Sequence, residues 1–404
     1  MISLNELTNL ANKCTCGNHH NDILIDEIVI SDDALIKAVK YIEKSQFEKV
    51  VIIADQNTFE VAGKRVTEIL SDEKIDYSIT IISANNQGDV IADEEALIEA
   101  MLGIPQNADS IIAVGAGTIH DIARFASYKM AKPFISIPTA PSVDGFNSMG
   151  APVVIKGVKT TYQMHSPIAV FADINVLQKA PKEMIAAGFG DMIGKYTSLA
   201  DWKFSHLIAK EPYCSLSAQL TKEALNNCVN AVKQIENGDK EGIKVLIESL
   251  IQSGLAMLLV GYSSPASGGE HHLSHFWEMD FIKENKSQVL HGAKVGVSSQ
   301  IILDLYKNNV LDLIGNKEQL KNFSTAEAKA IFDKQHEIIT ILELLPKPKE
   351  IANMLSMLEG SVTPYDLGIE PALVQDSLNK AHELRNRYTL LKFWNEHIGE
   401  HQYV

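Results

Sequence analysis

A buried strand, a glycine turn and the start of a helix follow one another in residues 110–121, which read Ser110-Ile111-Ile112-Ala113-Val114-Gly115-Ala116-Gly117-Thr118-Ile119-His120-Asp121. Glycines let the backbone approach a pyrophosphate closely, and the following helix offers free N–H groups and the positive end of its dipole. A Gly-x-Gly turn also occurs where no ligand binds. The motif therefore favours nucleotide binding only together with the segments around it.

Further short strands surround this motif and alternate with amphipathic helices. The strands that we predict cover residues 49–55, 77–82, 110–114 and 133–138. Helical spacing predicts helices in the gaps, including residues 60–70 and 93–102. Strands that alternate with helices are typical of βαβ units, so we expect a parallel sheet in an α/β domain.

The pattern changes after Asp173, where predicted strands end and long helical stretches begin. These stretches cover residues 215–236, 241–261, 292–307 and 371–392. A boundary near residues 175–185 would divide the chain into an α/β nucleotide-binding domain of residues 1–178 and an all-helical domain of residues 179–404. Two such bodies form a cleft between them, which is a common place for a small-molecule site.

Composition limits the classes of function. The 404 residues include 36 Lys and Arg against 51 Asp and Glu, which gives a net charge of −15. A chain this acidic repels phosphate backbones and anionic lipid surfaces, so we expect no nucleic-acid partner. Its longest apolar runs, such as residues 256–260, are far shorter than the roughly 20 residues that span a bilayer. We expect a soluble cytoplasmic protein whose cysteines are reduced.

Asp55 ends the predicted strand 49–55 and is a candidate for recognising a nucleotide ribose. It precedes Gly115 by sixty residues, whereas the usual dinucleotide fingerprint places its acid about 20 residues after the glycines. A carboxylate accepts hydrogen bonds from ribose hydroxyls and repels a 2′-phosphate, which favours NAD over NADP. The alternative interpretation of Asp55 is a helix N-cap or turn residue.

A second loop follows the predicted strand 133–138 and reads Ile137-Pro138-Thr139-Ala140-Pro141-Ser142-Val143-Asp144-Gly145-Phe146-Asn147-Ser148. Its two prolines stiffen the backbone, and its side chains offer hydroxyls, a carboxylate and an amide within a short stretch. Structural turns seldom carry so many small hydroxyl groups after a buried strand. We therefore expect this loop to contact a ligand.

Three predicted helices carry side chains of the types that commonly bind metals. Asp191 lies on one helix and His291 begins another. On a third, His271 and His275 are four residues apart and share one face. Imidazole and carboxylate groups from separate helices suit a divalent catalytic ion with open positions. The histidine pair lacks the internal glutamate of a His-Glu-x-x-His peptidase, and exposed or capping histidines are the alternative interpretation.

Cys14 and Cys16, followed by His19 and His20, have donor atoms that suit zinc. However, one residue separates the cysteines, whereas common structural zinc sites have two to four. We therefore interpret this stretch as a surface loop with two thiols.

Together these segments resemble the sn-glycerol-1-phosphate dehydrogenases, in the group that also holds iron-type alcohol dehydrogenases, glycerol dehydrogenase and dehydroquinate synthase. The resemblance runs over nearly the whole chain in the same order. It rests on Asp55, Gly115-Ala116-Gly117-Thr118, Thr139-Ala140-Pro141-Ser142-Val143-Asp144-Gly145, Gly190-Asp191, Glu270-His271-x-x-x-His275 and His291-Gly292. It implies a dehydroquinate synthase-like fold, in which an α/β N-terminal nucleotide-binding domain precedes an all-helical C-terminal metal-binding domain, and a homodimer.

The resemblance also implies roles for individual residues. NAD, or NADP, would be held by Asp55, Gly115, Ala116, Gly117, Thr118, Ile119, Thr139, Ala140, Pro141, Ser142 and Ser148. The divalent metal, which would be zinc, nickel or iron, would be bound by Asp191, His271 and His291. The substrate would contact Asp144, Asp191 and His275, of which Asp191 and His275 would be catalytic. The family often has glycine in place of Ala116, and a shift of one residue would give the metal to His272.

The implied reaction interconverts dihydroxyacetone phosphate and sn-glycerol 1-phosphate for phospholipid metabolism. Hydride moves between C2 and the nicotinamide, while the metal acts as a Lewis acid on the C2 oxygen. His275 would relay a proton or orient the substrate hydroxyls. Candidates for holding the phosphate are main-chain donors, or the side chains of Lys156, Lys159, Thr160 and Thr161. A solvated turn between strands would also explain these four residues.

Three other functions fit the same motifs. A glycerol dehydrogenase, or a related polyol dehydrogenase, shares the hydride chemistry and needs no phosphate pocket. A dehydroquinate synthase-like lyase would need a strongly basic site, which the sequence does not reveal. A non-catalytic sugar-phosphate sensor would have no need of the three metal ligands.

Overall fold

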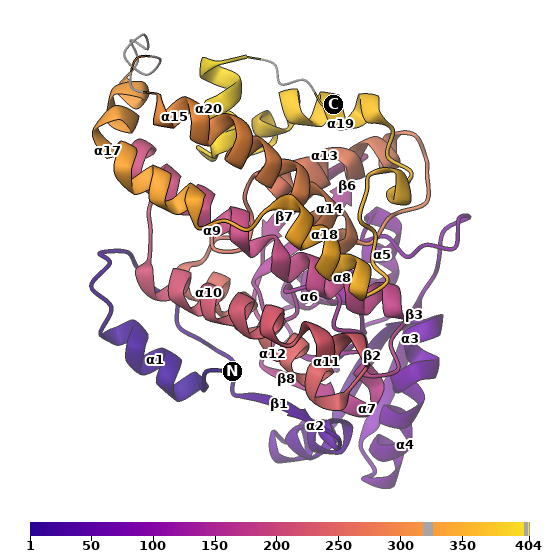
Figure 1. Cartoon of the computed structure of the whole chain (residues 1–404). Helices are drawn as coiled ribbons and strands as arrows, with labels where there is room; N and C mark the ends of the chain where they lie inside the picture. The colour runs from indigo at the N-terminus through magenta and orange to yellow at the C-terminus, as the bar shows by residue number, and fades with distance from the viewer. Residues whose placement is uncertain (317, 319–325, 400–402, 404) are drawn as a thin grey trace.

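The computed structural model describes residues 1–316, 318, 326–399 and 403 (Figure 1). Its N-terminal region is built on a six-stranded parallel sheet with the order β1-β8-β5-β4-β2-β3. The strands are β1 (Glu27–Ser31), β2 (Lys49–Asp55), β3 (Asp76–Ile82), β4 (Ser110–Gly115), β5 (Phe134–Pro138) and β8 (Ala169–Asp173). The predicted α/β class and parallel sheet are confirmed.

Alternate residues of each strand pack on opposite faces of this sheet. Val50, Ile52 and Ala54 of β2 share a hydrophobic cluster with α2 (Ala34–Lys44) and α4 (Lys64–Asp72). Val51 and Ile53 share another with α5 (Glu94–Leu102) and α6 (Gly117–Lys129). Because helices cover both faces, the central strands are continuous apolar runs rather than alternating ones.

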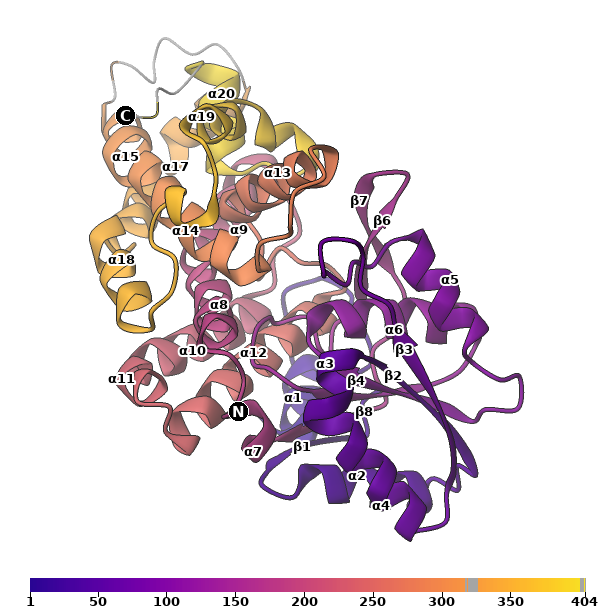
Figure 2. The same cartoon turned by 90° about the vertical axis from the view of Figure 1, so that its right-hand side faces the viewer.

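A short antiparallel hairpin stands apart from the sheet (Figure 2). It consists of β6 (Gly150–Ile155) and β7 (Val158–Gln163), which are joined by a tight turn at Lys156 and Gly157. Both turn residues have positive φ angles, 52° and 73°, which the glycine adopts without strain. The sequence analysis gave no bounds for β1, β6, β7 or β8, but a turn between strands, its alternative interpretation of residues 156–161, agrees with this hairpin.

The C-terminal region consists of helices in the part of the chain that the structure describes. They are α7 (Ile174–Leu177), α8 (Lys182–Ile193), α9 (Lys195–Ala209), α10 (Ser215–Asn230), α11 (Val232–Glu236), α12 (Lys240–Val260), α13 (Gly269–Lys283), α14 (His291–Asp304), η2 (Leu305–Val310), α15 (Leu311–Gly315), α17 (Ala326–Glu343), α18 (Pro348–Met357), η3 (Tyr365–Leu367), α19 (Pro371–Lys380), η4 (Ala381–Leu384) and α20 (Leu390–His397). The N-terminal region adds α1 (Leu4–Asn12), α3 (Gln56–Thr58) and η1 (Phe59–Gly63).

Helix α12 is the central helix of this C-terminal region. Among the described helices it alone is long and apolar enough to cross a membrane, but 78% of its apolar window is buried inside the protein. Leu246, Leu250 and Leu255 of this helix are fully buried in the largest hydrophobic cluster. We therefore interpret α12 as a core helix.

Several predicted helices differ in their bounds from the helices of the structure, and one predicted helix is not continuous. The predicted helix 371–392 is interrupted between η4 and α20. Arg385 is extended there, with φ −139° and ψ 140°, and the hydroxyl of Thr389 caps α20 by accepting from the N–H of Lys392. The predicted helix 215–236 is likewise divided at Ala231, and helix 60–70 begins with the π-helical turn η1.

Candidate active site

The carboxyl ends of three neighbouring strands meet at one edge of the sheet. Strand β4 lies between β2 and β5, so Asp55, Gly115 and Pro138 end adjacent parallel strands. This edge contributes to a cleft of about 390 Å³ whose other wall comes from the C-terminal helices. In open α/β sheets this edge is where ligands bind.

The glycine turn brings the N-terminus of α6 to the cleft. A Cβ on Gly115 would lie 2.5 Å from Ile119, and one on Gly117 would lie 2.9 Å from Val143. Both positions therefore need glycine for close packing. Ala116 is the N-cap of α6 and has no side chain to cap it. Ala116, Gly117 and Thr118 line the cleft, and their backbone geometry suits a pyrophosphate.

Asp55 is the N-cap of the short helix α3, as the alternative interpretation proposed. Its Oδ1 accepts from the N–H of Thr58 at 2.8 Å, and the hydroxyl of Thr58 accepts from the N–H of Asp55 at 3.1 Å. Capping fixes the direction of the carboxylate at the end of β2. Asp55 does not line the cleft itself.

The loop after β5 divides into a buried part and a part that faces the cleft. Ser142, Asp144 and Ser148 line the cleft. The other predicted contacts, Thr139 and Ala140, are buried and do not line it, and Pro141 and Gly115 are likewise buried beneath it.

The sequence analysis missed the residue that holds this loop, Arg124 of α6. Its fully buried guanidinium donates to the carbonyls of Gly145 at 2.6 Å and Gly150 at 2.9 Å, and it pairs with Asp121 at 2.8 Å. Burial raises the pKa of Asp121 to about 7, although Arg124 opposes this shift. Arg124 therefore fixes the backbone that presents Ser148 to the cleft.

Three predicted metal ligands converge from three helices. One donor atom each from Asp191 of α8, His271 of α13 and His291 of α14 lies within 4.8 Å of the other two. The Nε2 atom of His271 is 3.8 Å from Oδ1 of Asp191. This donor set of two imidazoles and one carboxylate fits a divalent ion that keeps positions open. We call these three residues the cleft cluster.

Glycines allow the helices of the cleft cluster to approach closely. A Cβ on Gly190 would lie 2.4 Å from the carbonyl oxygen of Gly292, and one on Gly292 would lie 1.8 Å from the carbonyl of Ala187. Backbone atoms cannot yield at such distances. The glycines beside Asp191 and His291 in the sequence therefore set the distance between α8 and α14.

A buried glutamate orients His271. The Nδ1–H of His271 donates to Glu270 at 2.7 Å, and the hydroxyl of Thr197 donates to the same carboxylate at 2.6 Å. This bond leaves Nε2 as the lone-pair nitrogen that faces Asp191. Burial, and secondly the charge of Lys195, lowers the pKa of His271 to about 3, so it is neutral. His272 is also buried but lies outside the cleft cluster.

Lys195 compensates the charge of the acidic groups and was not predicted. Its Nζ lies 2.7 Å from Asp191 and 2.8 Å from Asp144, and it is fully buried. Burial disfavours the charge of Lys195, but Asp144 and then Asp191 outweigh burial and raise its pKa. The N–H of Asp144 also donates to Asp191 at 3.0 Å. The spacing of four residues between Asp191 and Lys195 is the sequence signal that could have revealed this pair.

Basic residues extend the cleft beyond His275. Arg385 donates to Nε2 of His275 at 2.9 Å and to the hydroxyl of Ser267 at 3.0 Å. Burial lowers the pKa of Arg385 to about 10, which leaves it positively charged at neutral pH. Lys159 of the hairpin also lines the cleft and pairs with Glu278 at 2.8 Å. The sequence analysis reported no basic cluster because Arg385 is far from the other motifs in the chain.

Of the four phosphate candidates, the structure brings two to the cleft. Lys159 and Thr161 line it, whereas Lys156 and Thr160 do not. Lys156 lies at the turn of the hairpin, where its N–H donates to Glu94 at 2.6 Å. The alternation of side chains along β7 explains why residues 159 and 161 share one face.

Comparisons with known proteins agree with this arrangement. Residues 29–181 match a family model described as iron-containing alcohol dehydrogenase. The chain is 49% identical over 398 residues to glycerol-1-phosphate dehydrogenase (NAD(P)+) of Geobacillus stearothermophilus, with 98% of both chains covered. It is 50% identical over 396 residues to the protein of the same name from Geobacillus thermodenitrificans, again with 98% of both covered.

A solved structure supports the fold. The iron-containing alcohol dehydrogenase of Corynebacterium glutamicum matches with a TM-score of 0.65 at 16% identity, and 92% of each chain is covered. At this identity the match speaks for the architecture alone: a parallel α/β sheet followed by helices.

Proposed function

The chain belongs to the glycerol-1-phosphate dehydrogenase family, and from this we propose that it interconverts dihydroxyacetone phosphate and sn-glycerol 1-phosphate with NAD(P)(H). The relatives that are about half identical over 98% of the chain carry this name. The proposal rests on one observation: a candidate nucleotide-binding helix end and candidate metal ligands line the same cleft. The uncapped N-terminus of α6 and the histidines of the cleft cluster both line it.

At the nucleotide end, we propose that α6 binds the pyrophosphate through backbone N–H groups. Ser142 and Ser148 offer hydroxyls beside it. Asp55, fixed by its cap at the end of β2, would accept from the ribose hydroxyls and would repel a 2′-phosphate. This charge supports a preference for NAD over NADP.

At the reacting end, Asp191, His271 and His291 would hold one divalent ion, for which zinc, nickel and iron all suit the donor set. When bound, the ion would supply Lewis-acid polarisation of the C2 oxygen. Glu270 keeps His271 correctly turned, burial keeps His271 neutral, and Lys195 balances the charges of Asp191 and Asp144. These contacts fix the positions of the ligand side chains.

The geometry around His275 supports an orienting role rather than proton relay. Its Nε2 accepts from the Arg385 guanidinium, and burial together with Arg385 holds its pKa well below the usual range. A base of such low pKa accepts a proton poorly. Asp144, which the hydroxyl of Ser253 contacts at 2.8 Å, would accept from substrate hydroxyls on the same side.

The substrate phosphate would bind Arg385 and Lys159. Arg385 donates to two neutral acceptors, so its charge is available to an anion. An Arg385→Gln variant should raise the KM for dihydroxyacetone phosphate roughly 10- to 100-fold, because a hydrogen bond to a charged group is lost. The KM for dihydroxyacetone, which has no phosphate, should change much less. Arg65→Gln, on the exposed surface of α4, is the control, and equal shifts for both substrates would contradict the assignment.

The proposal as a whole is tested by NADH oxidation with dihydroxyacetone phosphate. Activity should disappear on chelation and return when one of zinc, nickel or iron is added back. Turnover of dihydroxyacetone at an equal rate would favour glycerol dehydrogenase instead. Binding of NADH without turnover of either substrate would favour a sensor. We further propose that the protein is cytoplasmic and forms a homodimer. Sedimentation of the purified protein would check the oligomeric state.

A further inference from the structure

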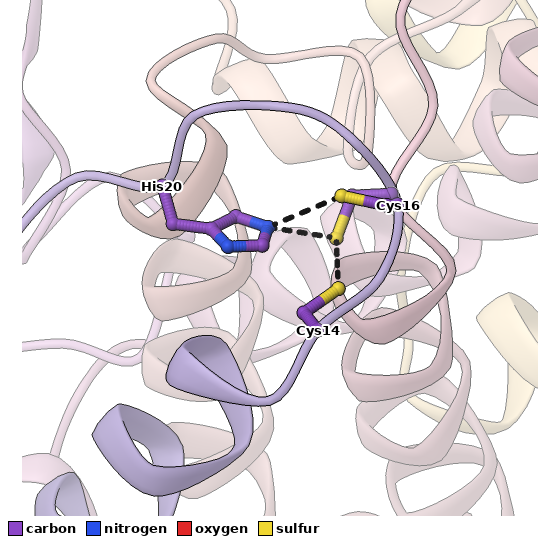
Figure 3. A group of neighbouring side chains, drawn as sticks. Cys14, Cys16 and His20 are labelled. Atoms are coloured by element: carbon purple, nitrogen blue, oxygen red, sulfur yellow. Dashed lines mark hydrogen bonds between the residues drawn. The ribbon is translucent and has the colours of Figure 1, made fainter.

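A second cluster of metal-binding side chains lies where the N-terminal segment meets the helical region. Cys14, Cys16 and His20 follow α1, and Cys214 is the N-cap of α10. The side chains labelled in Figure 3 point toward one another. One donor atom from each of the four residues lies within 4.8 Å of all the others. We call these four residues the sulfur cluster, and none of them lines the cleft.

The distances within the sulfur cluster match those of a tetrahedral zinc site. With Zn–S bonds of about 2.3 Å and a Zn–N bond of about 2.0 Å, tetrahedral geometry places two sulfurs about 3.8 Å apart and sulfur and nitrogen about 3.5 Å apart. The Sγ atoms of Cys14 and Cys214 are 3.8 Å apart. Nε2 of His20 is 3.5 Å from Cys16 and 3.3 Å from Cys214.

Hydrogen bonds to two of the sulfurs support their role as thiolates. The N–H of Ser217 donates to Sγ of Cys214 at 3.4 Å, at the positive end of α10. The side-chain amide of Asn18 donates to Sγ of Cys16 at 3.4 Å and to the carbonyl of Tyr213 at 2.8 Å. Such donors stabilise negative charge on sulfur and orient metal ligands.

Local backbone conformation explains how the unusual Cys-x-Cys spacing works. Gly17 has a φ of +78°, which turns the chain back immediately after Cys16. His20 then returns to the same point, while Cys214 arrives from a distant part of the sequence. The four donor atoms can therefore meet at one point even though a single residue separates Cys14 from Cys16.

The environment indicates a structural rather than a catalytic site. Cys214 is buried, and the other three ligands are half-buried. Cys14, Cys16 and Cys214 pack in a small hydrophobic cluster with Trp202 and Tyr262. Four protein ligands complete a tetrahedral shell, so no position is left for a substrate.

We propose that Cys14, Cys16, His20 and Cys214 bind one zinc ion, which fastens the N-terminal segment to α10. On binding, each of the three thiols loses a proton to solvent and the neutral imidazole donates a lone pair. Hydrogen bonds already place this segment along α12. The N–H of Ile2 donates to Gln252 at 3.0 Å, and the N–H of Asn21 donates to the carbonyl of Leu259 at 2.8 Å.

The site also supports one wall of the cleft. Tyr262 packs edge-on against Trp202 and lines the cleft together with Ser263. Asn21, one residue after His20, donates to the carbonyl of Leu258 at 3.0 Å, and Leu258 lines the cleft too. The zinc ion therefore stabilises a wall without touching the reacting atoms.

The metal content of purified protein tests the proposal. After expression with zinc, the unaltered chain should hold one more equivalent than a His20→Ala variant. His19→Ala changes the exposed neighbouring histidine and is the matched control. Cys214→Ser should lose the same equivalent, whereas Cys228→Ser changes a buried cysteine of the same helix and should retain it. Equal zinc content in His19→Ala and His20→Ala would overturn the proposal.

Cobalt substitution separates this site from the cleft cluster. Of the two clusters, the sulfur cluster alone offers thiolates, so thiolate-to-cobalt charge-transfer absorption should appear in the unaltered chain and in a His291→Ala variant. It should disappear in Cys214→Ser and persist in Cys228→Ser. Failure of the proposed enzymatic function would leave this absorption intact. A Cys14–Cys214 disulfide in freshly purified protein without the absorption would overturn the zinc assignment.

Limited proteolysis measures the structural consequence. Cleavage within residues 1–26 should become at least about tenfold faster in Cys214→Ser than in Cys228→Ser, because the protected state depends on zinc. Equal cleavage rates would overturn the fastening role even where zinc is bound.

Discussion

The cleft cluster and the sulfur cluster are assembled in different ways. The cleft cluster takes one carboxylate and two imidazoles from three helices of the C-terminal region, beside an open cavity. The sulfur cluster takes three thiols and an imidazole from two segments, away from that cavity. Three protein ligands leave room for a substrate, whereas four close the shell. The number and position of the donors thus indicate a catalytic role for the cleft cluster and a structural role for the sulfur cluster.

The two clusters also differ in how they manage charge. In the cleft cluster, Lys195 lies within 2.8 Å of both Asp144 and Asp191, so the carboxylates are compensated by the protein itself. In the sulfur cluster, negative charge arises only when the thiols release their protons to solvent as an ion binds. We therefore expect the cleft to keep its structure when a bound metal is lost, and we expect metal binding at the sulfur cluster to stabilise the structure around it.

The largest expected effect comes from removing a ligand of the cleft cluster. His291→Ala should lower kcat/KM at least about 1000-fold, because Lewis-acid stabilisation of the transition state is lost. The protein should lose the cleft metal but keep the metal of the sulfur cluster. Steady-state kinetics with metal analysis checks both. His336→Ala, on an exposed face of α17, should behave like the unaltered chain, and full activity of His291→Ala would refute the ligand assignment.

Removing the positive charge of Lys195 tests whether the protein itself compensates the carboxylates of the cleft. Lys195→Met leaves the buried Asp191 and the half-buried Asp144 without their partner, which should lower the free energy of unfolding of the metal-free protein by roughly 3–5 kcal/mol. A divalent ion replaces the missing charge, so added metal should raise the Tm more in the variant than in the unaltered chain. Thermal unfolding with and without metal measures this. A smaller metal effect in the variant would show that Lys195 does not compensate these acids.

The orientation of His271 should matter to one cluster alone. Thr197→Val removes the hydroxyl that donates to Glu270 at 2.6 Å, and it should weaken metal binding in the cleft by about tenfold. Competitive chelation measures the affinity. Thr8→Val, on the exposed surface of α1, is the control. Charge-transfer absorption from the sulfur cluster should stay the same in both variants, and its loss in Thr197→Val would mean that the clusters are coupled.

The smallest expected effect concerns the support of the sulfur cluster. Asn18→Ala removes the donors to Sγ of Cys16 and the carbonyl of Tyr213. Loss of about one net hydrogen bond should weaken zinc binding roughly fivefold. Chelator competition measures the change, with Asn12→Ala at the exposed end of α1 as the control. An effect on the cleft metal of equal size would contradict a local role for Asn18.

Local sequence patterns predicted much of the sheet. Strand 49–55 is confirmed residue for residue, and strand 110–114 is one residue short. The apolar runs are unambiguous because helices cover both faces of the sheet. Strand β1 was missed because its residues are only half-buried at the sheet edge, which weakens the apolar pattern.

The predicted helix 371–392 shows where local patterns fail. Its residues have helical spacing, but the backbone is extended at Arg385. Contacts of Arg385 with Ser267 and His275 decide that conformation, and these partners are more than a hundred residues away. A pattern within twenty residues contains no record of such contacts, so the basic side of the cleft was missed as well.

By itself the sequence determined the α/β sheet and the glycine turn before α6, because each depends on neighbours within a few positions. It also named Asp191, His271 and His291 as candidate metal ligands. Only the tertiary structure brought Lys195 between two carboxylates, Arg385 beside His275 and Cys214 to within 3.8 Å of Cys14. These contacts join segments up to 200 residues apart. An ion pair or a metal site forms only when its atoms are close in space, so these contacts exist only once packing has fixed the distances between the segments.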